Sequence, residues 1–307
     1  MTWLALLAGN CLHAVITALL GLSMITAADS LLILAIAAAA STVLGALVAR
    51  RNPAPRIPAA RSLGWLNLWT AVTFVSFFLG VAVYSAVVVF TLGACFAPLG
   101  VTAWSGLQAR RGQAANHWKG PGPAQWLAVA VLAVLGLSLV VALAGSEPRG
   151  IAALLLATAL GIIDGVAAGG VAIVSRSLGR DGAGVWQVMA HRYYATVVVA
   201  VVALLVVVPS GLLARPSMSL SMSVAAAFGS LVVPFFLIQY AVQRLSPVLV
   251  TAALALIPTI ALVVEMAAGR AVSSPALMLG LLIVPASLAI FAAEQNERVE
   301  VAVPRSR

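Results

Sequence analysis

Charged side chains are scarce in this sequence, since only 8% of its 307 residues are Asp, Glu, Lys or Arg. A soluble domain carries roughly 25% charged residues, because its surface must face water. Hydrophobic residues make up 63% of this chain, so its polar groups cannot cover a water-exposed surface. The composition excludes a soluble globular protein and predicts a chain that faces lipid over most of its area.

Cysteine is nearly absent as well, and Cys11 and Cys95 are the two in the sequence. Both lie inside apolar segments, so we expect no structural disulfide. The first apolar segment follows Met1 and Thr2 without a basic stretch before it. We therefore interpret this segment as a retained membrane helix and not as a cleaved signal peptide.

Several signatures of known chemistry are missing from the sequence. There is no P-loop for direct use of ATP and no Gly-x-Ser-x-Gly motif of a hydrolase. His13, His117 and His191 are scattered, without the spacing of metal ligands. The net charge of +9 falls in short loops rather than in a basic stripe, which argues against a nucleic-acid partner. We expect a protein that is not an enzyme and binds no metal or cofactor.

Long apolar runs are what the sequence has instead. Backbone polar groups in lipid must be satisfied internally, which leaves helices or a closed barrel. Barrel strands alternate apolar and polar residues, whereas residues 195–208 are almost continuously apolar. The sequence therefore predicts an all-α membrane protein with ten transmembrane helices. The predicted spans are about 2–24, 30–49, 65–84, 87–108, 125–144, 150–174, 191–209, 223–242, 246–268 and 275–293, each close to the roughly 17–25 residues that a bilayer requires.

Basic residues are distributed unequally between the two predicted sides of the membrane. Of the 17 Lys and Arg residues, 14 lie on the side of both termini, and Arg149, Arg215 and Arg270 lie on the other. Short cytoplasmic loops carry the excess of Lys and Arg. We predict a multi-pass protein of the inner (cytoplasmic) membrane with both termini in the cytoplasm.

The two halves of the chain resemble each other when the second is shifted by 160 residues. Pro98 then lies on Pro258, and Arg110 lies on Arg270. The loop after the third span is uncharged, while its counterpart carries Arg244, as expected if the two loops lie on opposite sides. Five spans per half predict two inverted five-helix repeats, a design of many secondary transporters. The predicted units are a first repeat (1–145), a second, inverted repeat (150–293) and a cytoplasmic tail (294–307).

Two segments carry a family resemblance. The run Gln239-Tyr240-Ala241-Val242-Gln243-Arg244-Leu245-Ser246-Pro247, followed by Pro258, resembles the second repeat of the drug/metabolite transporter (DMT) superfamily, EamA type. The run Arg192-Tyr193-Tyr194-Ala195 is similar to the same family. The family often has a Gly-Glu pair after the proline helix, where this chain has Gly269-Arg270 and Ala109-Arg110. The resemblance implies export or exchange of small metabolites, often amino acids.

Two carboxylates fall inside the predicted spans, and an intramembrane charge is costly enough to mark a functional candidate. Asp164 follows Gly161 and precedes Gly165 and Gly169, whose four-residue spacing predicts a close helix contact. Asp164 should point about 100° away from Gly165, where it could bind a proton or cation, or hydrogen-bond to a neighbouring helix. Glu265 either lines the pathway or pairs with Arg270.

Uncharged polar residues complete the predicted substrate and ion pathway. His13 and Asn10 share one helix face, and His13 either carries a proton or packs neutrally. Hydroxyls such as Thr70 either contact substrate or bond to their own helix backbone. Pro98 and Pro258 are predicted hinges, or they only shape the bundle. The remaining pathway candidates are Trp69, Thr73, Gln239 and Tyr240.

Basic residues are not predicted within the membrane. We expect no Lys or Arg deep in a span, and Arg192 is interpreted as a cytoplasmic anchor. The combined reading is a secondary active transporter that exports a small metabolite, an amino acid or amphipathic amine, by alternating access. Its partners would be the substrate, protons and membrane lipids, with a monomeric or homodimeric assembly. The alternatives are a lipid-linked sugar flippase of the same fold and a non-transport membrane subunit.

Overall fold

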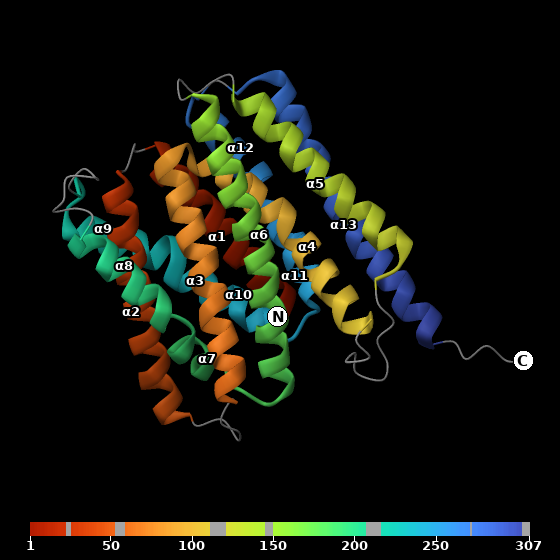
Figure 1. Ribbon diagram of the computed structural model, residues 1–307, viewed down its shortest axis with the longest axis horizontal. Coiled ribbons are helices and arrows are strands. Elements are labelled where there is room, and N and C mark those ends of the chain that lie inside the picture. The colour runs from red at the N-terminus through yellow and green to blue at the C-terminus, as the bar shows by residue number, and fades with distance from the viewer. Residues whose placement is uncertain are drawn as a thin grey trace, which may run out of the picture.

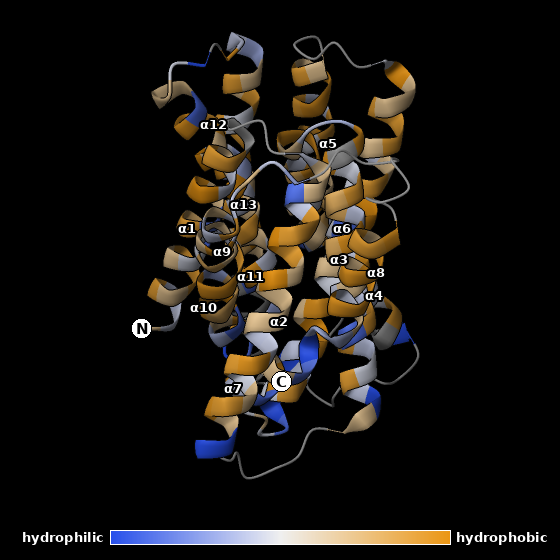
Figure 2. Cartoon of the chain, turned by 90° about the vertical axis from the view of Figure 1, so that its left-hand side faces the viewer, coloured by the Kyte–Doolittle hydropathy of each residue, from blue (hydrophilic) through white to orange (hydrophobic). Residues whose placement is uncertain are grey.

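The computed structural model describes residues 1–22, 26–52, 59–110, 121–144, 150–206, 216–270 and 272–302. Regular structure in these residues is helical, and it forms ten helical spans that are long and apolar enough to cross a membrane. The predicted fold class is confirmed. Hydrophobic residues cover the helices along most of their length (Figure 2), as a lipid-facing bundle requires.

The first six spans are each a single helix. They are α1 (Thr2–Leu22), α2 (Ala27–Arg51), α3 (Ala60–Val83), α4 (Ala86–Arg110), α5 (Pro123–Ala144) and α6 (Ile151–Arg180). The tenth span is also one helix, α13 (Ser274–Ala302). Pro98 lies inside α4 and Pro285 inside α13 without ending either helix.

The seventh, eighth and ninth spans are each divided. The seventh span consists of α7 (Val185–Arg192) and α8 (Tyr194–Val206). The eighth consists of α9 (Leu220–Ala227), the π-helix η1 (Phe228–Val232) and α10 (Val233–Val242). The ninth consists of α11 (Pro247–Leu254) and α12 (Ile257–Ala267). Proline explains two of these divisions, because it has no N–H and clashes with the preceding turn. Pro234 follows the π-helix, and Pro258 begins α12 after a turn.

Contacts between helices from distant parts of the sequence organise the bundle (Figure 1). The sixth span, α6, packs against α3 and α4. The first span, α1, packs against α10 and α12. The long helices α5 and α13 run side by side at one edge, and α2 packs against α7 and α8 at the opposite edge.

Glycines bring α6 close to α4. A Cβ added at Gly165 would lie 2.6 Å from the Gly93 oxygen, and one at Gly169 would lie 2.8 Å from the Val101 nitrogen. A Cβ added at Gly161 would lie 2.8 Å from the Cβ of Leu92, which is also on α4. The predicted close contact at these glycines is therefore confirmed, and α4 is the helix that they contact.

An acidic clamp holds the start of α2. Thr26 and Asp29 form a capping box. Asp29 also accepts hydrogen bonds from the Ser217 N–H at 2.8 Å, the Ser217 hydroxyl at 2.7 Å and the Met218 N–H at 2.9 Å. The clamp fastens the entry to α9 onto α2 at the end of the bundle away from the termini.

Several predicted boundaries are wrong. The sixth span continues as helix to Arg180, and the seventh begins at Val185, six residues before the predicted start at 191. The candidate tenth span ends at Glu294, next to the predicted end at 293, and the helix continues from there into the predicted tail as far as Ala302. Residues 303–307 of the predicted tail lie outside the described residues.

Candidate functional site

A buried arginine lies at the break of the seventh span. Arg192 ends α7 and is the eighth residue of the 22-residue span Val185–Val206. Its exposure is only 4%. The prediction that Arg192 is an interfacial anchor, and that no Lys or Arg lies deep in a span, is wrong. The error follows from the seventh span, which begins at Val185 and so encloses Arg192.

The Arg192 guanidinium joins helices from across the bundle. Its Nε donates to Thr70 Oγ1 of α3 at 3.2 Å, and its Nη1 donates to Gln239 Oε1 of α10 at 2.8 Å. The hydroxyl of Ser175 on α6 donates to the same Gln239 oxygen at 3.3 Å. We call Arg192, Thr70, Ser175 and Gln239 the arginine cluster; all four are buried.

Among the described residues, the positive charge of Arg192 is not balanced by a negative side chain. Within the described part of the chain, no acidic side chain forms an ion pair with Arg192. Its guanidinium instead lies 5.3 Å from the ring centroid of Tyr193 and 5.8 Å from that of Phe235, contacts that stabilise a cation modestly. A buried charge with neutral partners is costly, so the cluster is an unusual place for an arginine whose role is only structural.

Asn67 of α3 bridges the break between α7 and α8. Its side-chain amide donates to the His191 carbonyl, and its Oδ1 accepts from the Ala195 N–H at 3.3 Å. Helix ends leave backbone groups without intrahelical partners, and Asn67 supplies partners on both sides of Tyr193. The interruption is thus stabilised by α3, the helix that also carries Thr70.

Asp164 lies in the contact between α6 and α4. Its exposure is 8%, and its carboxyl faces Gly93, where a Cβ would overlap Oδ2. No described residue donates a hydrogen bond to this carboxyl or forms an ion pair with it. The carboxyl therefore lies within the contact between α6 and α4, and Gly93 provides the space for it.

His13 is paired with the π-helix of the eighth span. Its Nδ1 lies 2.6 Å from the Ser230 carbonyl oxygen. Since a carbonyl only accepts, Nδ1 is the donor. The residue four positions after Ser230 is Pro234, which has no N–H to donate to that carbonyl. The rings of Phe90 and Phe235 pack on the imidazole at 5.1 and 5.0 Å.

Three predicted residues have buried polar atoms without a hydrogen-bond partner in the structure. Both amide atoms of Asn10, the Thr73 hydroxyl and Gln239 Nε2 are in this state. Unsatisfied groups of this kind are costly in a lipid-embedded interior. They mark the places in the bundle where a bound molecule or water would gain most.

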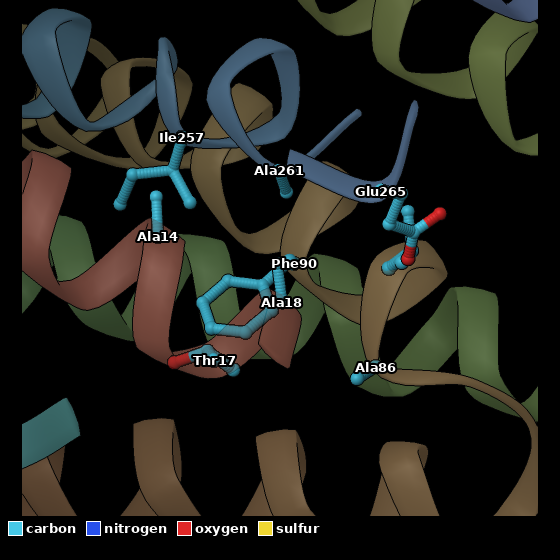
Figure 3. A pocket seen from close by; sticks show the side chains of 9 residues that line it. Ala14, Thr17, Ala18, Ala86, Phe90, Ile257, Ala261 and Glu265 are labelled. Atoms are coloured by element: carbon cyan, nitrogen blue, oxygen red, sulfur yellow. The ribbon is translucent and has the colours of Figure 1, made fainter. Parts of the chain in front are cut away.

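Glu265 lies away from the arginine cluster, on α12. Its Oε1 is 3.3 Å from Nη1 of Arg270. The sequence offered two interpretations of Glu265, and pairing with Arg270 is one of them. Glu265 also lines a small cavity of about 10 Å³ between α1, α4 and α12, beside Phe90 and Thr17 (Figure 3). Such a cavity holds about one water, so it is not a substrate site in this conformation.

Trp69 and Tyr240 are engaged by other groups. The Trp69 ring packs over Gly170 of α6, with Trp104 6.1 Å away in an edge-on contact. The ring of Tyr240 is covered by the Arg244 guanidinium at 3.7 Å. The structure therefore brings Thr70 and Gln239 of the predicted residues together, whereas Trp69, Tyr240, Glu265, His13 and Asp164 lie at separate contacts.

The two matched prolines differ in their effect on the helix. Pro98 lies inside the continuous helix α4, whereas the chain leaves the helix at Ala255 and Leu256 just before Pro258. Their sequence positions correspond, but the break occurs in the second half alone.

Sequence reasoning missed Arg192 and Ser175 as members of the site. The signal for Arg192 was the position of the Gly182-Ala183-Gly184 turn, which starts a helix at Val185 and puts Arg192 two turns inside it. For Ser175 no comparable signal exists, since a single serine on an apolar helix is ordinary.

Comparisons with known proteins identify the fold but no family. No protein-family model matches the chain, and no curated protein matches it. A solved structure whose title reads only "Crystal structure of protein" is similar, with a TM-score of 0.66 at 16% sequence identity. The match covers 95% of this chain and 98% of the other. This chain is a ten-helix, multi-pass membrane protein that shares its fold with that structure over nearly its whole length.

Proposed function

We propose that this chain is a secondary active transporter that moves a small metabolite across the cytoplasmic membrane by alternating access. Both termini would lie in the cytoplasm, as the distribution of basic residues suggests. The observation that carries the proposal is the arginine cluster, in which buried polar groups meet at an interrupted helix deep in an apolar bundle. Transporter binding sites are commonly built at such interrupted helices.

The packing of the spans supports two inverted repeats. If the first five spans correspond in order to the last five, then the first corresponds to the sixth, and the third and fourth correspond to the eighth and ninth. The sixth span packs on the third and fourth, through α6, α3 and α4. The first packs on the eighth and ninth, through α1, α10 and α12. The first span of each proposed repeat thus packs against helices of the other repeat.

The arginine cluster spans both proposed repeats. Thr70 belongs to the first, whereas Ser175, Arg192 and Gln239 belong to the second. A rocking motion between the repeats would separate Thr70 from Arg192 and admit water or substrate to the guanidinium. The unpartnered atoms of Gln239 and Asn10 would then gain partners, which offsets part of the cost of opening.

Asp164 is the proposed proton or cation site. It lies on α6 of the second repeat and faces Gly93 on α4 of the first. Relative movement of the two helices would bring water to the carboxyl, so its proton or cation occupancy would change with the conformation. Coupling of this kind needs a group whose surroundings differ between the two states.

The test is counterflow in proteoliposomes with a panel of amino acids and amines. We expect saturable uptake by the wild type, its loss in Asp164→Asn, and normal uptake in Asp181→Asn, which removes an exposed carboxylate in the turn after α6. Folding of each variant is checked by size-exclusion chromatography. Absence of flux for every compound, in protein shown to be folded, would sink the proposal.

A further inference from the structure

The strongest unexplained feature is that Arg192 is buried with donors to spare. A guanidinium carries five N–H donors, and two of its hydrogen bonds are to Thr70 and Gln239. These two bonds use two of the five N–H groups, so the other three have no partner among the described residues. From this surplus we infer that Arg192 and Gln239 bind the carboxylate of the transported molecule. The inference rests on the proposed transport function and names its substrate class.

A second donor lies beside the guanidinium. Gln239 Oε1 accepts from both Arg192 and Ser175, which fixes the orientation of its amide. Its Nε2 takes no part in these two bonds, and it is buried without a partner. Because Nε2 and Oε1 belong to one carboxamide, this free N–H group lies close to the guanidinium. A carboxylate has two oxygens and can accept from both residues at once.

The charge balance selects a ligand that presents a single carboxylate to Arg192. Arg192 is the one Lys or Arg side chain that is buried among the described residues. A single positive charge neutralises one carboxylate, whereas a phosphate ester near neutral pH carries up to two charges and would leave the second unpaired. A ligand whose only charge is an ammonium group would meet repulsion at Arg192. Of the two substrate types expected from the sequence, the cluster thus selects a molecule with a carboxylate, such as an amino acid, over a simple amphipathic amine.

A purely structural role explains less of this geometry. Arg192 occupies the last turn of α7, where a cation interacts favourably with the helix dipole. That interaction is available to an exposed arginine and requires neither burial nor three surplus donors. The guanidinium carbon lies over the rings of Tyr193 and Phe235, and these contacts are not hydrogen bonds that would satisfy the remaining N–H groups.

The experiment measures thermal stabilisation of the purified protein by matched pairs of compounds. Each pair is an amino acid and its amide, for example L-leucine with L-leucinamide and L-phenylalanine with L-phenylalaninamide. We expect at least one acid to raise Tm, and its amide to need a roughly 10- to 100-fold higher concentration for the same shift, since the charge-assisted bonds are lost. Inorganic phosphate and phosphatidylglycerol micelles are tested alongside.

Variants separate binding from folding. Arg192→Gln should abolish the difference between acid and amide, Arg192→Lys should retain part of it, and Arg180→Gln, at an exposed position, should behave as wild type. Without ligand, Arg192→Gln should melt at the same temperature as wild type or higher, because an uncompensated buried charge is gone.

Three outcomes would overturn the inference: no stabilisation by any acid, an acid effect that survives Arg192→Gln, or stabilisation by phosphate or the anionic lipid alone. Saturable counterflow of amines that Arg192→Gln leaves unchanged would overturn the carboxylate site while leaving the transport proposal intact. No transport of any compound by wild type would overturn the transport proposal itself.

Discussion

At the scale of single residues, buried polar side chains in this bundle differ in how well they are satisfied. Asp29 accepts hydrogen bonds from Thr26, Ser217 and Met218, so it is a completed structural clamp. His13 has a carbonyl partner and aromatic neighbours. Gln239 and Asn10 retain buried atoms without partners. Satisfied groups stabilise the fold, whereas each buried polar atom without a partner in the structure lowers its stability.

The His13 contact leads to a prediction about stability. His13→Ala removes a donor from the Ser230 carbonyl and should lower the free energy of unfolding by about 1–3 kcal/mol. In Pro234→Ala, residue 234 regains an N–H that can reach the same carbonyl, so the penalty of His13→Ala should be smaller by about 1 kcal/mol in that background. Both are measured by denaturant titration in detergent micelles. Strict additivity of the two substitutions would show that the carbonyl is not what links them.

At the scale of helices, the contact between α6 and α4 depends on the absence of side chains. Gly165 and Gly169 let the α6 backbone approach Gly93, Ala97 and Val101 of α4. In lipid the hydrophobic effect does not drive helices together, so van der Waals contact at small residues contributes most. The same approach places Asp164 against Gly93, which means that the packing of this pair and the position of the carboxyl are set together.

Gly165→Ala tests this contact. The added Cβ would lie 2.6 Å from the Gly93 oxygen and 2.8 Å from Phe96 Cβ, so the helices must separate, at a cost of about 1–3 kcal/mol. Gly64→Ala on α3 is the matched control, because a Cβ there meets nothing within 4 Å. The control should be neutral or stabilising by about 0.5–1 kcal/mol. Equal unfolding midpoints for the two variants would show that α4 and α6 are not in close contact.

At the scale of the whole molecule, the orientation in the membrane is open to direct measurement. Arg180 ends α6, and Ser219 precedes α9, at opposite ends of the bundle. In a background without Cys11 and Cys95, we expect Ser219→Cys to react with a membrane-impermeant thiol reagent in intact cells. Arg180→Cys should react only after permeabilisation. The reverse pattern would place the termini outside the cytoplasm.

The sequence was sufficient for the fold class and insufficient for the site. Ten apolar runs predict ten helices because the bilayer requires each span to be long, apolar and hydrogen-bonded within itself. The glycine spacing at Gly161, Gly165 and Gly169 likewise predicted a close contact, though not with which helix. The arginine cluster escaped because it depends on where the seventh span begins and on which helices lie beside it. A shift of six residues in one boundary moved Arg192 from the interface to the interior.

The divided spans have a mechanical consequence. In the first half each span is one helix, whereas the seventh, eighth and ninth spans contain a break at Tyr193, a π-helical turn and a break at Ala255. A continuous helix resists bending, while a joint with fewer backbone hydrogen bonds is compliant. We therefore expect bending to be concentrated at these three positions in the seventh, eighth and ninth spans. Motion of the bundle would then be asymmetric along the chain, because its compliant joints lie in three of the last five spans.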